Sequence, residues 1–405
     1  MKNDPNTIYI LSLTGGGAKG YLSNKFLKRF YERWRLSRGQ TEEEFGEIWQ
    51  NFDVIGGTSV GSIGALSYGL GKSIDEVLDI FKNQAPWIFT TRTRTDTVLF
   101  RCNSSEPSNT TGFTSDDVLL LLASNNQFYK AFCDNGICNG YNFDYGEDTG
   151  PDSGSSGCSN YGHVRLREIL KHTLKVPRVI DIAGVPFEYQ DIAKMQDMKT
   201  NIVVPVYCNS IGQPVIVSNI ANPEYEGQNF RAYEVAMSSS AAPVYLPPYV
   251  IEGREYIDGG IYQNSASQVA ITAGNYLKKK ATRICVVEIT TGLDLNPHDS
   301  SNTPGFGFLE VIQSFISDSI GGVQANTARD LRIRSKYTLE EINYYSFAPV
   351  LDPIGDGQGD VEYGLDSTEP ETFAYYDYLV ERAFNPNDRK NDLQKIDEMI
   401  VRLNA

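Results

Sequence analysis

The chain has 405 residues, and its 36 Lys and Arg against 51 Asp and Glu give a formal net charge of −15. A chain of this length buries about 75% of its unfolded surface and needs no disulfide or metal for stability, while ordinary Gly and Pro contents with 19 Phe, 24 Tyr and 3 Trp exclude collagen-like, coiled-coil and disordered classes. The negative charge argues against nucleic acid as a partner and against general adsorption to anionic membranes, because both depend on clustered cationic side chains.

The N-terminal part alternates short apolar strands with amphipathic helices. Ile8–Leu13 predicts a buried strand, and Leu22–Trp34 carries apolar side chains at helical spacing. A second strand is expected at Phe52–Ile55, followed by a helix of small residues. Ser73–Glu76 has the capping-box pattern and predicts a helix that ends near Lys82. This order predicts an α/β fold with a parallel sheet.

The middle of the chain changes in composition. Residues 85–161 are rich in Gly, Ser, Asn and Asp, with one short helical island at Val118–Leu122, and we expect them to form a polar insertion or lid over the core. The α/β pattern then resumes. Its expected helices and strands are Val164–Leu174, Ile202–Tyr207, Pro214–Ser218, Ala232–Ser239, Tyr256–Ile257, Ser267–Lys278 and Arg283–Ile289.

The C-terminal part is expected to be mostly helical at Phe306–Tyr337 and Phe373–Leu403. No linker clearly separates two domains. We therefore expect one domain over residues 5–350 and a helical extension over residues 351–405 that packs on it.

Several signals are weak or missing. No segment approaches the ~18 consecutive apolar residues of a spanning helix, and Ile8–Leu13 is too short for a signal-peptide core. We expect a cytoplasmic protein, or one secreted without a cleavable signal peptide. The six cysteines form no CxxC pair, and the spacing of Asp352, Asp356 and Asp360 does not match a calcium loop, so ordinary thiols and no metal are expected.

A glycine-rich loop, Gly15–Gly20, lies between the first predicted strand and helix. Successive backbone N–H groups at a helix N-terminus can bind an anion. A Walker A loop is excluded because no Gly-Lys-Ser/Thr follows. A dinucleotide site, an oxyanion hole and a tight turn remain open.

A second motif, Gly57–Gly61, reads G-x-S-x-G with Ser59 at its centre. A strand precedes it and a helix follows it, which is the context of a nucleophile elbow. The alternative is a β–α turn in which Ser59 only caps the helix.

A third motif, Asp258–Gly260, follows the predicted strand Tyr256–Ile257. A serine nucleophile needs a base, which is usually histidine. The chain has only His163, His172 and His298, none within a motif. Direct action of Asp258 as the base is favoured over a triad of Ser59, Asp258 and His298, and over a plain Asp-Gly turn.

Together the three motifs resemble those of the patatin-like phospholipase family. That family has a Gly-rich loop ending in Arg/Lys-Gly, a G-x-S-x-G serine and a D-G-G or D-G-A aspartate, and all three occur here in order. Phe52–Gly61 and Ser239–Pro248 are similar to the family along their whole lengths, and the resemblance covers about residues 8–290. It implies a three-layer fold with a central, mainly parallel sheet and helices on both faces. After the aspartate motif the family usually has Asn-Asn-Pro, whereas this chain has Asn264 followed by Ser265 and Ala266.

The resemblance also implies roles for individual residues. Ser59 would attack an ester carbonyl, Asp258 would accept the proton and later activate water, and no cofactor would be needed. Gly57 and Gly61 would form the nucleophile elbow. Backbone N–H groups would hold the oxyanion, and adjacent loop residues would bind substrate. These residues are Gly15, Gly16, Gly17 and Ala18 for the oxyanion hole, and Lys19 and Gly20 for the substrate.

The resemblance implies a phospholipase A or lysophospholipase that meets membranes transiently. Its alternatives are a catalytically silent binding or storage protein and an enzyme that transfers the acyl group to an alcohol. Six cations of the first helix would contact lipid, or else form a solvated helix face. The apolar segments Pro86–Phe89 and Val98–Phe100 would also contact lipid, or else pack on the core. The cations are Lys25, Lys28, Arg29, Arg33, Arg35 and Arg38. A protein or nucleotide activator is implied by analogy with bacterial members.

Overall fold

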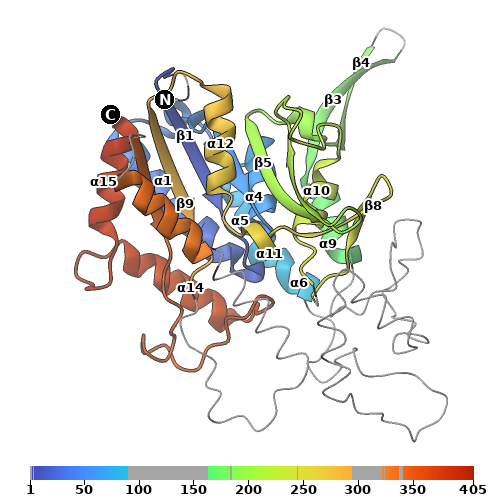
Figure 1. Cartoon of the computed structure of the whole chain (residues 1–405). Coiled ribbons are helices and arrows are strands. Elements are labelled where there is room, and N and C mark those ends of the chain that lie inside the picture. Colours follow the sequence, from blue (N-terminus) through green and yellow to red (C-terminus); the bar gives the residue numbers. More distant parts are fainter. Residues whose placement is uncertain are drawn as a thin grey trace, which may run out of the picture.

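A central sheet of eight strands organises the molecule. The computed structural model describes residues 2, 4–89, 163–182, 185–243, 245–293, 322, 324–336 and 341–405. The strand order is β10-β9-β1-β2-β5-β8-β7, and β6 pairs with β5 (Figure 1). The strands are β1 (Thr7–Leu13), β2 (Val54–Gly57), β5 (Asn201–Cys208), β6 (Gln213–Ser218), β7 (Tyr249–Ile251), β8 (Arg254–Asp258), β9 (Arg283–Ile289) and β10 (Glu341–Phe347).

The strands from β10 to β5 are parallel, and β6, β8 and β7 add antiparallel pairs at the other side. The sheet is therefore mainly parallel, as the sequence predicts. β1 lies between β9 and β2, and all its residues are buried. Its carboxyl end leads into the glycine loop, and that of β2 leads into Ser59.

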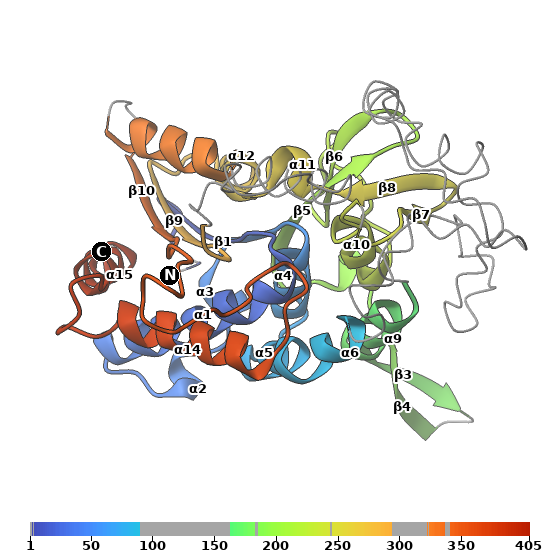
Figure 2. The same ribbon diagram turned by 90° about the horizontal axis from the view of Figure 1, so that it is seen from below.

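Helices cover both faces of the sheet, which gives the expected three layers (Figures 1 and 2). Alternation along β1 explains the two cores: Tyr9, Leu11 and Leu13 join one hydrophobic cluster, while Ile8 and Ile10 join the other. The first cluster includes residues of α1 (Gly20–Ser37), α4 (Val60–Gly69), α9 (His163–Thr173), α10 (Ala232–Ser239), α14 (Pro370–Ala383) and α15 (Leu393–Asn404). The second includes residues of α12 (Ser267–Leu277) and of the helical segment 324–336.

Shorter helices complete the described part of the fold. They are η1 (Gly17–Lys19), α2 (Glu42–Phe45), α3 (Ile48–Asn51), α5 (Ile74–Asp79), η2 (Ile80–Gln84), α6 (Ala85–Phe89), η5 (Met195–Asp197) and α11 (Gly260–Gln263). The capping box before α5 is confirmed, because Ser73 Oγ accepts the Glu76 N–H and Glu76 accepts the Ser73 N–H.

Most predicted elements match, and the differences have local causes. The strand expected at Phe52–Ile55 is two residues later, at Val54–Gly57. Four strands were not expected from the sequence. They are β7, β10 and the two strands of a hairpin, β3 (Lys175–Ile182) and β4 (Val185–Ile192). This hairpin projects from the body (Figure 1), so no buried face produces a clear alternation of apolar and polar residues.

The basic residues of α1 are paired with acids. Lys25 pairs with Asp377, Lys28 with Asp75, Arg29 with Glu381, Arg33 with Asp397 and Arg35 with Glu42. Three of these acids belong to α14 and α15, which lie against α1 (Figure 2). The sixth cation, Arg38, donates to the Gln40 amide oxygen. These ion pairs favour the solvated-face alternative over a stripe that contacts lipid.

Other predictions fall partly outside the described residues. Residues 90–162, with Val118–Leu122 and Val98–Phe100, lie there, as do His298 and four of the six cysteines. The remaining two, Cys208 and Cys285, are buried free thiols. Among the described helices, none is long and apolar enough to cross a membrane.

Candidate active site

Strand register brings Ser59 and Asp258 to the same level of the sheet. Gly56 of β2 pairs with Val203 of β5, and Ser59 is three residues farther along the chain. Val206, three residues beyond Val203, pairs with Asp258 at the end of β8. Residues separated by 199 positions in the sequence therefore meet beyond the carboxyl end of β2, where parallel sheets commonly place binding sites.

Ser59 occupies a strained turn between β2 and α4. Its φ is 54° and its ψ is −130°, a region that L-residues rarely adopt and that costs about 1–3 kcal/mol. Its N–H donates to Ser239 Oγ at 2.9 Å, and that hydroxyl donates to the Pro205 carbonyl at 2.9 Å. Only 9% of Ser59 is exposed. The turn matches the predicted nucleophile elbow, and no side-chain cap from Ser59 to the helix is present.

The elbow requires glycine at Gly57 and Gly61 because backbones approach closely there. A Cβ on Gly57 would lie 2.2 Å from the Gly61 carbonyl oxygen, and one on Gly61 would lie 2.3 Å from the Leu13 carbonyl oxygen. Both positions are buried between β1, β2 and α4, so the neighbouring backbone has little freedom to move.

We expect Gly61→Ala to lower the free energy of unfolding by about 3 kcal/mol, because the added methyl group overpacks the buried strand β1. Urea denaturation measures the effect. Gly322→Ala is the matched control, since no atom of the described residues lies within 4 Å of a Cβ built there. Equal stability of the Gly61→Ala variant and the unmodified protein would contradict this account.

Asp258 is a buried carboxylate that contacts the Ser59 hydroxyl. It is 1% exposed, and its Oδ1 accepts the Gly260 N–H at 2.7 Å. Burial raises the pKa of Asp258 to about 7, although hydrogen bonds from the Ser59 hydroxyl and the Gly260 N–H oppose this effect. A carboxyl group with a pKa near neutrality is suited to proton transfer at physiological pH.

The glycine loop supplies two N–H groups without partners. The Gly15 N–H donates to Asn264 Oδ1 at 3.1 Å, and the Ala18 N–H donates to the Leu365 carbonyl at 2.7 Å. Among the described residues, no acceptor binds the N–H groups of Gly16 and Gly17. Of the four residues predicted for the oxyanion hole, Gly16 and Gly17 are therefore the ones with N–H groups available for an anion.

Gly16 and Gly17 adopt a conformation that other residues disfavour. Their φ values are 158° and 60°. A Cβ on Gly16 would lie 2.1 Å from Thr291 Oγ1, and one on Gly17 would lie 1.9 Å from the Leu365 carbonyl oxygen. The loop therefore turns tightly enough to direct successive N–H groups at one place.

A mostly apolar cavity of about 70 Å³ extends from this site. Gly16, Gly17, Ser59 and Asp258 line one end of it. Its apolar walls come from α4, η2, α6, α9 and the 242–246 loop: Val60, Ile63, Ile80, Phe81, Ala85, Ile88, Phe89, Leu166, Ala242, Tyr245 and Leu246. Lys19 and Gly20 are not among the described lining residues, and Gly20 packs against the Phe81 ring.

No histidine lines the cavity among the residues that the structure describes. A hydroxyl, a carboxylate and two N–H groups thus converge beside apolar walls, an arrangement that fits acyl transfer through serine. In the described part of the chain, no cluster of His, Cys, Asp or Glu has the makings of a metal site.

Two residues that hold this site are not predicted from the sequence. The Asn264 Oδ1 accepts the Gly15 N–H. The Ser239 Oγ accepts the Ser59 N–H. Neither contact has a local sequence signal, because the partners are more than 170 residues apart.

Comparison with known proteins adds a family match. A family model described as patatin-like phospholipase matches residues 11–271, which include all three motifs. A protein of Vibrio cholerae named cGAMP-activated phospholipase is 24% identical over 269 residues, covering 66% of this chain and 57% of that protein. An Escherichia coli protein of the same name is 25% identical over 271 residues, covering 66% and 56%. The chain thus spans about half the length of these curated relatives.

Among solved structures, VipD from Legionella pneumophila is similar at 14% identity and a TM-score of 0.33, covering 93% of this chain and 66% of that one. A score of this size is too low to bear on the fold or the site.

Proposed function

The chain belongs to the patatin-like phospholipase family, and we propose that it hydrolyses fatty-acyl esters of phospholipids with Ser59 as nucleophile and Asp258 as general base. The side chains of Ser59 and Asp258 carry this proposal: both line the same end of an apolar cavity, and the Ser59 hydroxyl is close enough to oppose the rise in the pKa of Asp258. A storage or binding protein would have no need for a buried carboxylate at this cost, nor for a strained serine beside it.

In the proposed reaction, Ser59 Oγ attacks the ester carbonyl while Asp258 accepts its proton. The N–H groups of Gly16 and Gly17 donate hydrogen bonds to the negative oxygen of the tetrahedral intermediate. Loss of one such donor typically costs about 2.7–4 kcal/mol of transition-state stabilisation. The alcohol leaves with the proton from Asp258, and an acyl-enzyme remains. Asp258 then removes a proton from water as the water oxygen attacks the acyl-enzyme, and it returns this proton to Ser59 Oγ as the bond to the acyl group breaks and the fatty acid is released.

The apolar cavity supports an acyl chain as the group that enters the site. Its walls contribute few polar atoms, so an aliphatic chain loses water without leaving polar groups unpaired. Ile63 is one helical turn from Ser59 on α4 and is buried against this cavity. A chain bound to Ser59 would therefore run along α4.

We expect Ile63→Phe to raise KM for a palmitoyl ester about tenfold while changing KM for an acetyl ester less than twofold, because the added ring narrows the cavity beyond its first carbons. Steady-state kinetics with nitrophenyl esters of both lengths measure this, and the acetyl ester serves as the control within the same variant. Equal effects on both esters would contradict the assignment of the cavity to the acyl chain.

The partners and location follow from the proposed substrate. We propose transient contact with a membrane surface by a protein that is cytoplasmic or secreted without a cleavable signal peptide. The names of both relatives include activation by cGAMP, which supports a nucleotide activator for this chain; a protein activator is the alternative.

Mass spectrometry of lipids released from mixed phospholipid vesicles tests the proposed function. The purified chain is incubated alone, with cGAMP and with eukaryotic cell extract. We expect free fatty acid and lysophospholipid in at least one condition, and none with Ser59→Ala. Absence of Ser59-dependent fatty-acid release in all three conditions would refute the proposal.

A further inference from the structure

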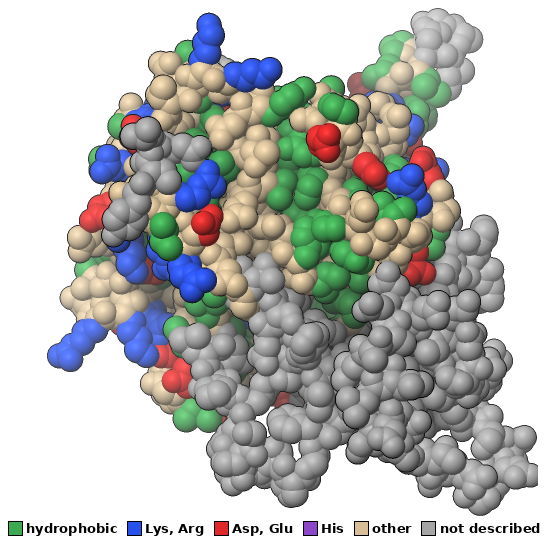
Figure 3. Space-filling model, viewed as in Figure 1, with side chains coloured by type: hydrophobic (Ala, Val, Ile, Leu, Met, Phe, Trp, Pro, Cys, Tyr) green, Lys and Arg blue, Asp and Glu red, His purple; other side chains and the backbone are tan. Residues whose placement is uncertain are grey.

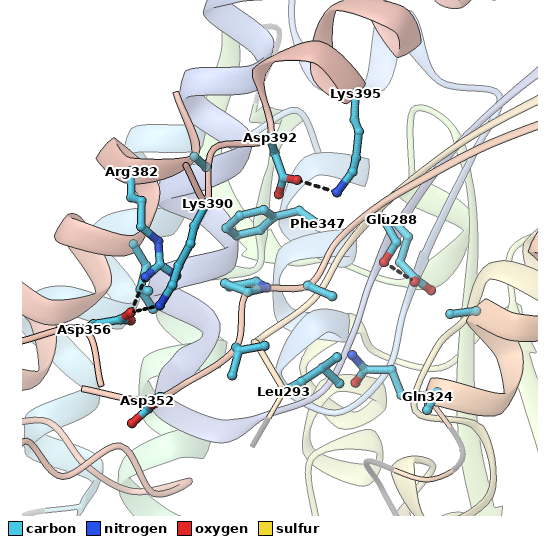
Figure 4. Close-up of a pocket in the computed structure, with 18 of the residues that line it drawn as sticks. Glu288, Leu293, Gln324, Phe347, Asp352, Asp356, Arg382, Lys390, Asp392 and Lys395 are labelled. Atoms are coloured by element: carbon cyan, nitrogen blue, oxygen red, sulfur yellow. Dashed lines mark hydrogen bonds and ion pairs between the residues drawn. The ribbon is translucent and has the colours of Figure 1, made fainter. Parts of the chain in front are cut away.

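A second and larger cavity lies at the carboxyl ends of β9 and β10. Its volume is about 520 Å³, within the usual range for small-molecule sites. It lies between the ends of β9 and β10, the helical segment 324–336 and the segment that joins α14 to α15 (Figure 4). Figure 3 shows Lys and Arg side chains gathered on this side of the molecule.

The carboxylates around this cavity already have partners. Asp356 accepts from Lys390 Nζ and Tyr375 Oη and forms an ion pair with Arg382 Nη1 at 2.7 Å. Asp392 pairs with Lys395, and Asp352 accepts the Gly355 N–H. The fourth carboxylate, Glu288, is fully buried and accepts four hydroxyl groups, from Ser265, Ser267, Tyr344 and Ser346.

Hydrogen-bond donors remain at the same cavity. Gln324 is 4% exposed, and its Nε2 has no partner among the described residues. Figure 4 shows the Gln324 amide at the cavity wall below Phe347. Among the described residues, the one hydrogen-bond partner of Arg332 is the Ala328 carbonyl in its own helix, to which its Nε donates. Lys390 and Lys395 each form one ion pair and retain further N–H groups.

The excess of available hydrogen-bond donors around this cavity indicates a ligand that supplies acceptors. Each of the four carboxylates already has at least one partner, while Arg332, Lys390, Lys395 and the buried Gln324 amide retain N–H groups that can still donate. A buried amide N–H without a partner destabilises the site, and an incoming acceptor would remove this cost. Oxygens of a phosphate group bind several such donors at once.

Gln324 also connects this cavity to the candidate active site. Its Oε1 accepts the Asn264 Nδ2–H at 2.9 Å, and Asn264 Oδ1 accepts the Gly15 N–H at 3.1 Å. Asn264 lines the acyl cavity, and Gly15 directly precedes the two glycines with free N–H groups. The neighbouring Ser265 is bound to Glu288 at the floor of the second cavity. A continuous hydrogen-bonded path therefore joins the two cavities.

We propose that this second cavity binds a small phosphorylated molecule, and that its binding activates the enzyme through Gln324, Asn264 and Gly15. A phosphate oxygen that accepts the Gln324 Nε2–H fixes the amide, which holds Asn264 and thereby the glycine loop. The activation rests on the proposed hydrolase function, whereas the binding does not.

Isothermal titration of the full chain with inorganic pyrophosphate tests the site directly. We expect saturable binding that weakens at least tenfold in Arg332→Ala and in Gln324→Glu. The second variant keeps an oxygen for Asn264 but replaces the N–H donor with a carboxylate oxygen. The exposed Lys280, which does not line the cavity, gives the control Lys280→Ala, expected to bind as the unmodified chain does. No binding, or equal binding by all four proteins, would overturn the site.

Hydrolysis of a soluble acetyl ester with and without saturating pyrophosphate tests the coupling. We expect pyrophosphate to raise kcat at least threefold in the unmodified chain and in Lys280→Ala, and less in Gln324→Glu. Unchanged kcat despite measured binding would overturn the coupling. Parallel titrations with sn-glycerol 3-phosphate and cGAMP distinguish a lipid headgroup from a nucleotide as the source of the phosphate. If no ester is hydrolysed in any condition, the hydrolase proposal fails while the titration still decides the site.

Discussion

Ser59→Ala is expected to lower kcat/KM for a phospholipid about 10⁶-fold, a loss comparable to that of removing the nucleophile from a serine protease. The substitution deletes only Oγ, and Ala adopts the positive φ of this elbow at about the same cost as Ser. The backbone N–H at position 59 still donates to Ser239 Oγ. We therefore expect an unchanged fold and unchanged affinity for pyrophosphate, with hydrolysis measured by release of labelled fatty acid.

Ser67→Ala is the matched control for this loss. Ser67 belongs to the same helix, is fully buried, and its Oγ has no partner among the described residues. Because no hydrogen bond is lost, we expect kcat/KM within twofold of the unmodified chain. If Ser59→Ala retained more than about 1% of the activity, a different nucleophile would have to exist.

The parts of the site that sequence predicts are those set by local backbone geometry. The backbone at Gly57 and Gly61 lies so close to neighbouring carbonyl groups that only glycine fits around Ser59. The G-x-S-x-G motif in the sequence therefore predicts this turn. The same holds for the glycine loop, where Gly16 and Gly17 have positive φ. β1 and β9 were also predicted within one residue, because a strand buried on both faces reads as a continuous apolar run.

The parts that sequence does not predict are contacts between distant segments. Nothing near Asn264 indicates that its amide bridges Gly15 and Gln324, which lie 249 and 60 residues away. The ion pairs of α1 with α14 and α15 are hidden from sequence for the same reason, because these acids follow more than 300 residues later. Charge counted along one helix says little about the potential at the surface until its tertiary neighbours are known.

Asp258 combines catalytic use with a cost in stability. Among the described residues, the buried carboxyl group accepts the Gly260 N–H and is near the Ser59 hydroxyl, and no cation acts on its pKa. A cation beside it would lower the pKa and weaken it as a base. The burial that raises the pKa to about 7 thus makes the group a stronger base than an exposed aspartate.

We expect Asp258→Asn to lower kcat/KM about 10³–10⁴-fold, because the amide cannot accept the Ser59 proton. In the unmodified chain, kcat/KM should be half-maximal near pH 7, where the buried carboxyl ionises, and should fall tenfold for each pH unit below. Above that pH it should be constant. Initial rates with a soluble ester between pH 5 and 9 measure this profile. The residual activity of the Asn variant should not vary in this range, and a profile with the same midpoint in both proteins would exclude Asp258 as the base.

The same substitution should stabilise the fold at alkaline pH. The carboxyl binds its proton more tightly in the folded state, with a pKa of about 7, than in the unfolded state, near the ordinary 3.8. Its contribution to the free energy of unfolding is therefore fully present below about pH 4 and is lost as the pH rises to about 7. At 1.36 kcal/mol per pK unit the loss is about 4 kcal/mol. Asp258→Asn keeps an oxygen for the Gly260 N–H and escapes this loss, so urea denaturation should show the variant gaining about 4 kcal/mol over the unmodified chain between pH 4 and pH 8. A difference that stays constant with pH would show that Asp258 does not ionise in a buried environment.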